Sequence, residues 1–494
     1  MALGQLEDRL KDKKIVIYGA GIWASVFYTY LRLLELDSNI VCFVVTTMQR
    51  LNTSLHDKSI RQYDEIKNEL ADCFVVIAIK NAEDLMDSLS CDHNGGLYCL
   101  TESQMEEIRG FIFSYYANMP IQRNKILVDC FGGRNGYSCN PKYIIEKLLE
   151  KRYPVEVVWN VLDRKKWEFP DGVRAIVYNS PEYFQELYTA GIVIDNSGVS
   201  SFPYKRPEQY AIHTWHGTGP FKKVGVAEYK GDKENIALMK KRHSFVDVFI
   251  SNSKDNTEMF RESFCYDGEI YECGSPRCDI LFQENHIKEK VYETFGIAPN
   301  KKILLYAPTF RGEWNRSENI STFKWYDLNM KQVLDALSQR FGEEFILMYR
   351  FHHALYEHNQ SPDFYPDGID VTFYPDIMEL IVAADVMITD YSSAMWDFSL
   401  QRRPVFLYHN DEREYADDRG FYWPISRWPY PNARTCEELC ETIREFDEGK
   451  YLERLEQFFQ DDPSYDDGHA ADRVAERIID VIEHPEKYGK EYGL

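Results

Sequence analysis

The sequence predicts an α/β protein built from parallel sheets, and three observations lead to that prediction. The chain has 494 residues, of which 44% are hydrophobic and 15% aromatic, so it is too long for one core and too apolar for general disorder. Short apolar runs alternate with longer segments of helical periodicity. Polar residues follow the carboxyl ends of these runs, where open parallel sheets bind ligands. We therefore expect two to four domains of this class.

The motifs divide the chain into three regions, residues 1–105, 106–285 and 286–494. The first region has apolar runs at 15–18, 40–45 and 74–79, with a Gly19-Ala20-Gly21 turn after the first run. This βαβ pattern fits dinucleotide binding. However, the second run ends in Val45-Thr46-Thr47, without the acidic residue that would hold a ribose hydroxyl. We therefore expect a Rossmann-like accessory domain with a structural or regulatory role, in preference to an NAD site.

The second and third regions repeat the α/β alternation. Strands are expected at 126–129, 155–159, 192–195, 246–251 and 270–273, then at 303–306, 345–350, 386–389 and 404–408. Asn140 and Pro141 are expected to open a helix, with Asn140 as its cap. The tail from 468 to 483 is helical in pattern and is expected to pack back across the second region.

Charge and cysteine content limit the classes of function. The chain carries 57 basic and 80 acidic residues, a net charge of −23, so general nucleic-acid binding is not expected. Its 11 cysteines include no CxxC pair, which favours a reduced cytosolic protein without a zinc site. The sequence shows no signal-peptide core and no run of 18 apolar residues, so we expect no membrane span.

The segment 213–225 contains the first catalytic candidate. His216 lies on a turn made by Gly217, Gly219 and Pro220, with Thr218 beside it. Lys222 and Lys223 follow directly. A histidine on such a turn, next to cations and free backbone N–H groups, suits proton abstraction beside an anionic substrate.

Further clusters follow the strands of the later regions. They comprise Arg277 with Asp279, Thr309 with Arg311, His352 with His353, Thr389 and Asp390 with Ser392 and Ser393, and Arg419. Ser392 and Ser393 start a helix and either bind phosphate or cap that helix. Arg277 either clamps a phosphate or forms a salt bridge, and Asp279 either orients it or caps the following helix. Because no carboxylate cluster suits a metal, we expect metal-free chemistry on an anionic diphosphate donor.

These motifs, in this order, resemble the CDP-glycerol glycerophosphotransferase family of teichoic acid and capsule polymerases and primases. They are Trp215-His216-Gly217-Thr218 with Lys222-Lys223-Val224-Gly225, Gly274-Ser275-Pro276-Arg277-Cys278-Asp279, Tyr306-Ala307-Pro308-Thr309-Phe310-Arg311, Thr389-Asp390-Tyr391-Ser392-Ser393 and Arg419-Gly420-Phe421-Tyr422, with Asn140-Pro141-Lys142 before them. The resemblance covers residues 125 to 480. Two features depart from it: Gly219 is an additional residue in the histidine loop, and the first 105 residues are not a general family feature.

The resemblance implies a GT-B fold, in which two Rossmann-like domains face a cleft, here with an N-terminal Rossmann-like domain added. It implies transfer of glycerol phosphate or ribitol phosphate from a CDP-activated donor to a hydroxyl of a lipid-linked polymer, with release of CMP and no metal or other cofactor. The site of action would be the cytoplasmic face of the membrane. Contact with the membrane would use either the amphipathic N-terminal segment or a basic patch that includes Lys222, Lys223, Lys240, Lys241 and Arg242, although such a cluster also fits a solvated helix face.

The resemblance also assigns roles to single residues. His216 matches the family's candidate base, and the second family histidine matches either His352 or His353. The remaining strand-end residues would hold the donor, whereas Gly217, Thr218, Lys222 and Lys223 lie on the acceptor side. Three alternatives remain: a GT-B glycosyltransferase that uses a nucleotide sugar, a nucleotide sensor that works through residues 19–24, and an NAD oxidoreductase. The polyol, the acceptor and the oligomeric state stay open.

Overall fold

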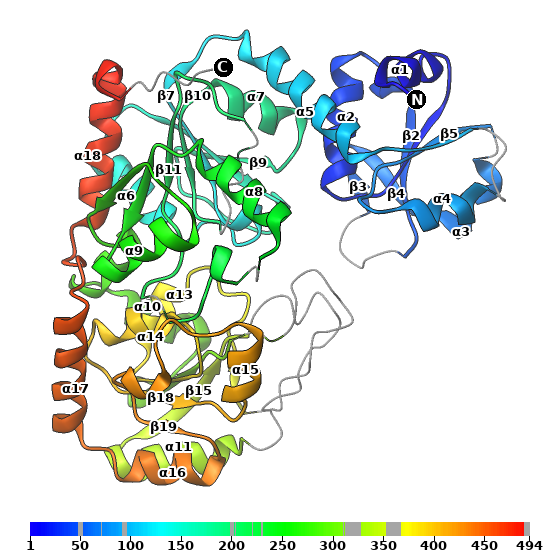
Figure 1. Ribbon diagram of the computed structural model, residues 1–494. Coiled ribbons are helices and arrows are strands. Elements are labelled where there is room, and N and C mark those ends of the chain that lie inside the picture. The colour runs from blue at the N-terminus through cyan, green and yellow to red at the C-terminus, as the bar shows by residue number, and fades with distance from the viewer. Residues whose placement is uncertain are drawn as a thin grey trace.

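The protein is an α/β protein with three sheets, as the sequence predicts (Figure 1). The computed structural model describes residues 1–47, 53–70, 72–90, 96–197, 202, 204–219, 221–228, 231–309, 311, 328–351 and 367–488. Within these residues, neighbouring strands pair in parallel, apart from one short antiparallel pair at the edge of the N-terminal sheet. The three sheets are called the N-terminal, middle and C-terminal sheets below.

The N-terminal sheet has the strand order β3-β4-β2-β1-β5-β6. Its strands are β1 Ile15–Tyr18, β2 Ile40–Val45, β3 Ser54–Leu55, β4 Lys58–Gln62, β5 Phe74–Ile77 and β6 Leu97–Cys99, and its helices are α1 Leu3–Leu10, α2 Ile22–Leu33, α3 Tyr63–Ile66, α4 Glu83–Ser90 and α5 Glu102–Ala117. Gly19 ends β1 with φ of +118°, and a Cβ on it would lie 2.9 Å from the Ala78 carbonyl oxygen. The turn therefore requires glycine for packing against β5, whatever it binds.

The N-terminal sheet does not have a core to itself. Helix α5 packs on both α2 and α7 (Pro181–Thr189) of the next region. One continuous apolar cluster therefore contains Leu31, Ile112, Tyr188 and Ala211. Removing residues 1–105 would expose part of this cluster to water, so a truncated chain is a poor test of what the N-terminal sheet does.

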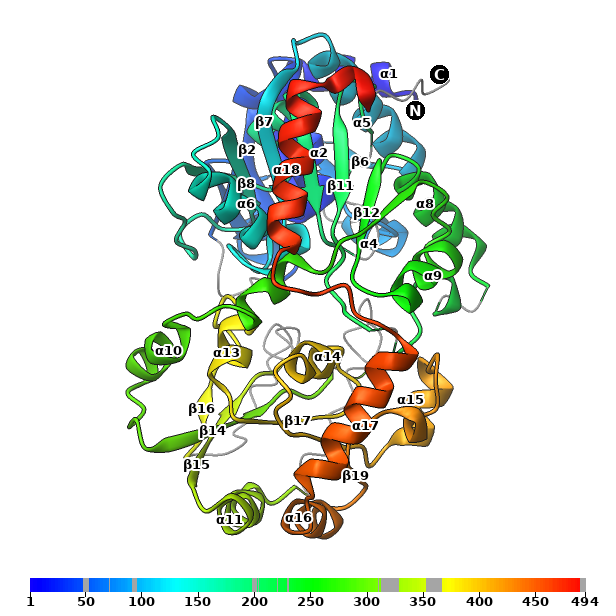
Figure 2. The same ribbon diagram turned by 90° about the vertical axis from the view of Figure 1, so that its left-hand side faces the viewer.

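The middle sheet has the order β13-β12-β11-β10-β7-β8-β9. Its strands are β7 Gln122–Asp129, β8 Glu156–Val161, β9 Val173–Val177, β10 Ala190–Asp195, β11 Tyr210–His213, β12 Val248–Ser251 and β13 Glu269–Glu272. Besides α7, its helices are α6 Cys139–Glu150, α8 Lys233–His243, α9 Lys254–Ser263 and α18 Ala470–Glu483. The sequence did not predict β9 and β11. Figure 2 shows α18 lying along this sheet, where it packs on α6.

The C-terminal sheet has the order β16-β15-β14-β17-β18-β19. Its strands are β14 Lys301–Tyr306, β15 Glu344–Tyr349, β16 Ile369–Asp370, β17 Val386–Thr389, β18 Val405–Tyr408 and β19 Asn432–Ala433. Its helices are α10 Ile287–Phe295, α11 Met330–Phe341, α13 Ile377–Ala383, α14 Ala394–Ser399, α15 Glu412–Asp418, α16 Cys436–Arg444 and α17 Glu448–Asp461. From α17 the chain crosses back to α18 on the middle sheet (Figure 2). No helix in the described ranges is both long and apolar enough to cross a membrane.

Candidate active site

The loop that carries His216 leaves the carboxyl end of β11, beside the end of β10. Trp215 has φ of +52°, a conformation that a bulky residue adopts only when its surroundings enforce it. His216 Nδ1 lies 2.5 Å from the Asn196 carbonyl oxygen. Because a carbonyl oxygen only accepts, Nδ1 carries the hydrogen and Nε2 keeps its lone pair. The loop thus presents His216 in the tautomer that a general base needs.

The surroundings of His216 keep its ring neutral. Burial lowers the pKa of His216 to about 3, and the nearby cations Arg277 and Lys222 act in the same direction, against the hydrogen bond to Asn196. At neutral pH the imidazole is therefore unprotonated, and its unprotonated Nε2 is available to take a proton.

Asn140 shapes the same loop, in a way that differs from the prediction. The N-cap of α6 is Ser138, and Asn140 lies inside the first turn of this helix. Its buried side chain donates from Nδ2 to the carbonyl oxygens of Thr214 at 3.0 Å and Trp215 at 3.1 Å, and its Oδ1 accepts from Arg277 N at 3.0 Å. The prediction that Asn140 caps the helix was wrong, because its amide is committed to the histidine loop.

Arg277 is less open to a ligand than a phosphate clamp requires. It lies in the 3₁₀ turn Pro276–Leu281 after β13 and is 5% exposed. Nη1 donates to the His216 carbonyl oxygen at 2.5 Å, and Nη2 donates to Asp397 Oδ2 on α14 at 2.8 Å. The structure therefore favours the salt-bridge alternative for Arg277 over the phosphate clamp.

Asp279 caps a helix, although not the one that follows it in sequence. Its carboxylate accepts from the backbone N–H groups of Ala470 at 2.9 Å and Ala471 at 2.7 Å, at the start of α18. Burial raises the pKa of Asp279 to about 6, although these two hydrogen bonds oppose the rise. Asp279 thus fastens α18 to the middle sheet, and this use of its carboxylate conflicts with the predicted role in donor binding.

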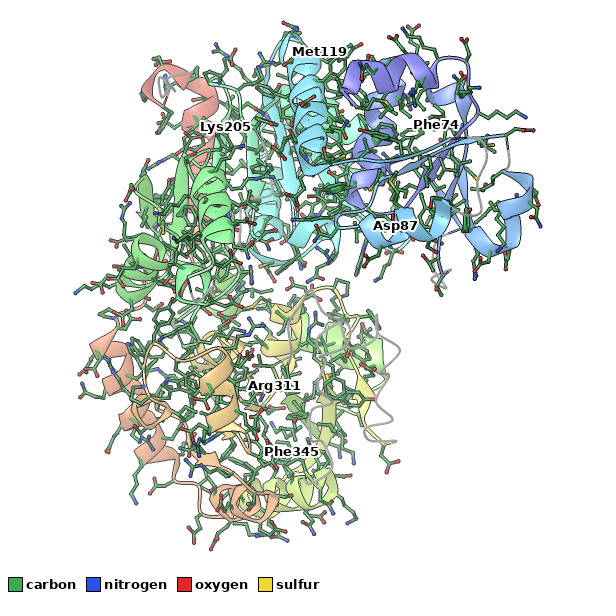
Figure 3. All side chains as sticks on the ribbon, turned by 45° about the vertical axis from the view of Figure 1, so that its right-hand side comes forward. Phe74, Asp87, Met119, Lys205, Arg311 and Phe345 are labelled. Atoms are coloured by element: carbon green, nitrogen blue, oxygen red, sulfur yellow. The ribbon has the colours of Figure 1, made fainter. Side chains whose placement is uncertain are left out.

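On the C-terminal sheet, Arg311 is also committed to carboxylates. Its guanidinium donates to Asp390 at 2.8 Å and to Asp411 at 2.6 Å, and it lies over the ring of Tyr391 at 4.9 Å. Figure 3 labels Arg311 among the side chains of this part of the molecule. Two other predicted donor residues form hydrogen bonds in the same cluster: Thr309 N donates to Asp390 Oδ1 at 2.8 Å, and Thr389 Oγ1 donates to the Ala307 carbonyl oxygen at 2.7 Å. Arg311 is therefore partly buried and occupied by contacts within the protein.

The structure brings the histidine loop against the start of α14. The N-cap of α14 is Ser393, whose side chain makes no capping hydrogen bond, and Ser392 Oγ, one residue earlier, accepts from Ala394 N at 3.3 Å. A Cβ placed on Gly217 would lie 3.5 Å from Ser393 Oγ, so this hydroxyl lies beside the loop. Thr218 Oγ1 donates to Asp397. Two clusters that are 175 residues apart in sequence therefore form one site where the middle and C-terminal sheets meet.

Lys222 and Lys223 face the C-terminal sheet rather than the middle sheet alone. Lys222 forms an antiparallel β-bridge with Phe421, and Lys223 N donates to the Gly420 carbonyl oxygen at 3.0 Å. Burial, followed by the charge of Arg419, lowers the pKa of Lys222 to about 8. Within the described residues its ammonium forms no ion pair, whereas Arg419 pairs with Glu228. Lys222 is thus a partly buried cation available for an anion.

Gly219, the additional residue of the loop, is fixed by packing. It has φ of +68°, and a Cβ on it would lie 2.5 Å from Trp396 Cε3 on α14. The two predicted histidines His352 and His353 lie outside the described residues. No group of three or more His, Cys, Asp or Glu side chains in the described part of the chain is arranged to hold a metal ion.

Comparison with known proteins gives one consistent family. The sequence model of the family described as CDP-glycerol:poly(glycerophosphate) glycerophosphotransferase matches residues 111–480. A teichoic acid poly(glycerol phosphate) polymerase of Bacillus spizizenii is 29% identical over 390 residues, which are 76% of this chain and 97% of that protein. Two other such polymerases, from Staphylococcus epidermidis and Bacillus subtilis, are covered over only about half of their length.

Two further comparisons bear on the polyol and on the fold. A teichoic acid ribitol-phosphate primase of Bacillus spizizenii is 31% identical over 288 residues, which are 56% of this chain and 71% of that protein. The solved structure of the wall teichoic acid polymerase TagF superposes with a TM-score of 0.64 at 27% identity, over 78% of this chain and 96% of that one.

Proposed function

The chain belongs to the CDP-glycerol:poly(glycerophosphate) glycerophosphotransferase family and is a CDP-polyol phosphotransferase, and on that premise we propose how its site performs the reaction. An acceptor hydroxyl of a teichoic-acid-like or capsule polymer enters between the middle and C-terminal sheets, which form the two halves of a GT-B arrangement. His216 Nε2 takes the hydroxyl proton as the oxygen attacks the β-phosphorus of the donor, and CMP leaves.

The observation that carries this proposal is the tautomer of His216 at the meeting point of the two halves. Its Nδ1 is held by the Asn196 carbonyl oxygen, and the loop lies against Ser393. A donor diphosphate beside this ring adds negative charge, which raises the pKa of His216 from about 3 toward a value better matched to proton transfer. The surroundings of His216 thus keep the base neutral, and a bound donor makes it a stronger base.

Lys222 supplies charge to the donor in this mechanism. Its ammonium has no ion pair among the described residues and lies with Arg419 near the strand ends of the C-terminal sheet. Ser393 and the backbone at the start of α14 add neutral hydrogen-bond donors. The protein's contribution is therefore positioning and charge neutralisation, as is usual for phosphoryl transfer.

The test is a donor screen that measures CMP release and product mass with CDP-glycerol, CDP-ribitol and nucleotide sugars. We expect turnover with a CDP-polyol, and we expect His216→Ala to lower kcat by about 10²–10⁴-fold. His286→Ala is the matched control, because His286 is exposed at the start of α10 and should leave kcat unchanged. Near-normal turnover in His216→Ala would refute the assignment of the base, and turnover only with nucleotide sugars would favour a glycosyltransferase.

We also propose peripheral contact with the inner face of the membrane, where a lipid-linked acceptor resides. The last turn of α8 carries Lys240 and Lys241, both exposed, in a chain of net charge −23. Arg242 is only partly exposed and contributes less to this surface. Co-sedimentation with anionic vesicles should be lost in a Lys240→Glu, Lys241→Glu double variant, and unchanged binding would exclude α8 as the contact.

A further inference from the structure

A buried ion pair joins the two halves of the site. Arg277 comes from the 3₁₀ turn after β13, and Asp397 comes from α14 of the C-terminal sheet. Arg277 Nη2 lies 2.8 Å from Asp397 Oδ2, and the two side chains are only 6% and 1% exposed. A charge that is buried to this extent is strongly destabilising unless an opposite charge compensates it. The pair therefore forms when the two halves dock.

The same two residues form hydrogen bonds to the loop of the proposed base on both sides of Gly217. Before Gly217, Arg277 Nη1 donates to the His216 carbonyl oxygen at 2.5 Å. After it, Thr218 Oγ1 donates to Asp397. Gly217 has no side chain of its own to form a contact, so these two contacts add to those of Asn140 and Asn196 in fixing the position of His216.

Asp397 is the group on which both contacts depend. Without its charge, Arg277 would keep a buried guanidinium with no anion, and its Nε already has no hydrogen-bond partner in the described part of the chain. Arg277 would then have to move toward water, and the His216 carbonyl oxygen would lose its donor. The carboxylate offers one oxygen to Arg277 and the other to Thr218, whereas an asparagine has a single acceptor oxygen for which these two donors would compete. One substitution on the C-terminal half thus releases a loop of the middle half.

We propose that Asp397 is a positioning residue, which places His216 for proton abstraction through Arg277 and Thr218 only when the two halves are docked. This inference rests on the proposed function of His216 and adds to it a coupling between domain assembly and the base. An acceptor hydroxyl would be deprotonated efficiently only in the assembled site, where the donor half is in place.

A second buried ion cluster between the halves supplies a matched control. Lys142 Nζ on α6 lies 2.8 Å from Asp376 Oδ2 and 2.9 Å from Glu379 Oε1, with all three side chains 9% exposed or less. Asp376 is a buried interdomain carboxylate like Asp397, but within the described residues it makes no hydrogen bond to the loop of His216. Asp376→Asn therefore weakens docking without releasing that loop.

The experiment compares Asp397→Asn with Asp376→Asn in full-length protein, with CMP release as the assay and thermal unfolding as the measure of stability. We expect Asp397→Asn to lower kcat by about a hundredfold, the loss typical of a base displaced by about 1 Å, while the KM for the CDP-polyol changes less than about threefold. Asp376→Asn should lower Tm by at least as much as Asp397→Asn does, but it should keep kcat within about threefold of the native value.

A double substitution separates positioning from a merely structural role. If Asp397 acts through His216, then Asp397→Asn should cost nothing further in a His216→Ala background, because the group that it places is absent. Multiplicative losses would overturn the inference, as would a kcat of Asp397→Asn within about threefold of the native value. Normal turnover of His216→Ala alone would instead refute the proposed base, so the two failures are distinguishable.

Thr218→Val covers the case in which Asp397→Asn does not fold. It removes one hydroxyl that donates to Asp397 and leaves the ion pair intact. We expect a loss in kcat of about three- to tenfold that also disappears in the His216→Ala background, since Thr218→Val removes the contact on only one side of Gly217. Unchanged kcat in Thr218→Val would contradict the proposed coupling.

Discussion

Lys222 should set the alkaline limit of the enzyme. Burial and the charge of Arg419 lower its pKa from 10.5 to about 8, so about 90% of the free enzyme carries this charge at pH 7 and about 10% at pH 9. If the ammonium neutralises the donor diphosphate, kcat/KM should fall about tenfold per pH unit above pH 8. His216, with a pKa of about 3, should add no acidic limb above about pH 5.

Two substitutions at Lys222 test this account by CMP release between pH 6 and 10, with the donor below its KM. Lys222→Arg keeps its charge throughout this range, so the decline near pH 8 should disappear. Lys222→Met lacks the charge at every pH, so kcat/KM should be about 10- to 100-fold lower at pH 7 and independent of pH. The control is Lys331→Arg, which changes an exposed lysine on α11.

Unfolding does not explain a loss of activity above pH 8. Between about pH 8 and 10.5 the unfolded chain holds the proton that the folded Lys222 has released, so the contribution of this residue to stability rises with pH in that window. Urea unfolding at pH 7, 8 and 9 checks this sign. A decline that persists near pH 8 in Lys222→Arg would refute the role of Lys222 in donor binding.

Three further predictions concern residues that shape the site. Asn140→Ala should lower the free energy of unfolding by about 2–3 kcal/mol and reduce kcat, because it leaves two carbonyl groups and one N–H of the histidine loop region unpaired; urea unfolding and CMP release test this. Gly219→Ala should cost more than Gly296→Ala in urea unfolding by about 1–3 kcal/mol, since both have positive φ but only Gly219 meets Trp396; equal costs would contradict this packing. The pKa of Asp279 is raised to about 6, so the folded protein gains stability from the protonated carboxyl at low pH and loses that gain as pH rises from 4 to 6. Asp279→Asn does not titrate, so its free energy of unfolding should increase relative to that of the native protein over this range. A difference between the two proteins that is independent of pH would contradict the raised pKa of Asp279.

The sequence predicts the strands better than it predicts the contacts of the site. The apolar runs at 15–18, 386–389 and 404–408 correspond to β1, β17 and β18, because a fully buried strand is visible in a short stretch of sequence. Strand β9 contains the partly exposed Val173 and the exposed Arg174, and β11, Tyr210–His213, includes the small Ala211 and ends in the polar His213. Neither has the uninterrupted apolar run that marks a buried strand.

The partners of the arginines could not be predicted for a different reason. Arg277 pairs with a carboxylate 120 residues later, and Arg311 pairs with Asp411 100 residues later. Nothing near either arginine indicates these partners, since they meet only after the strands have assembled. The local pattern of an arginine after a strand therefore looks the same whether the side chain meets a phosphate or a buried aspartate.

Because both arginines pair with aspartates, other groups must neutralise the negative charge of the donor diphosphate. Arg277 is neutralised by Asp397, and Arg311 lies between Asp390 and Asp411, so neither adds a net positive charge to the site. Among the described residues that were predicted to lie in the site, Lys222 is a cation without such a partner. A dianionic diphosphate therefore depends more on Lys222, on the hydroxyl of Ser393 and on backbone N–H groups than on arginine. The arginines instead act one step away, by fixing the loop and strand ends that carry those groups, which is why their loss should lower kcat more than donor affinity.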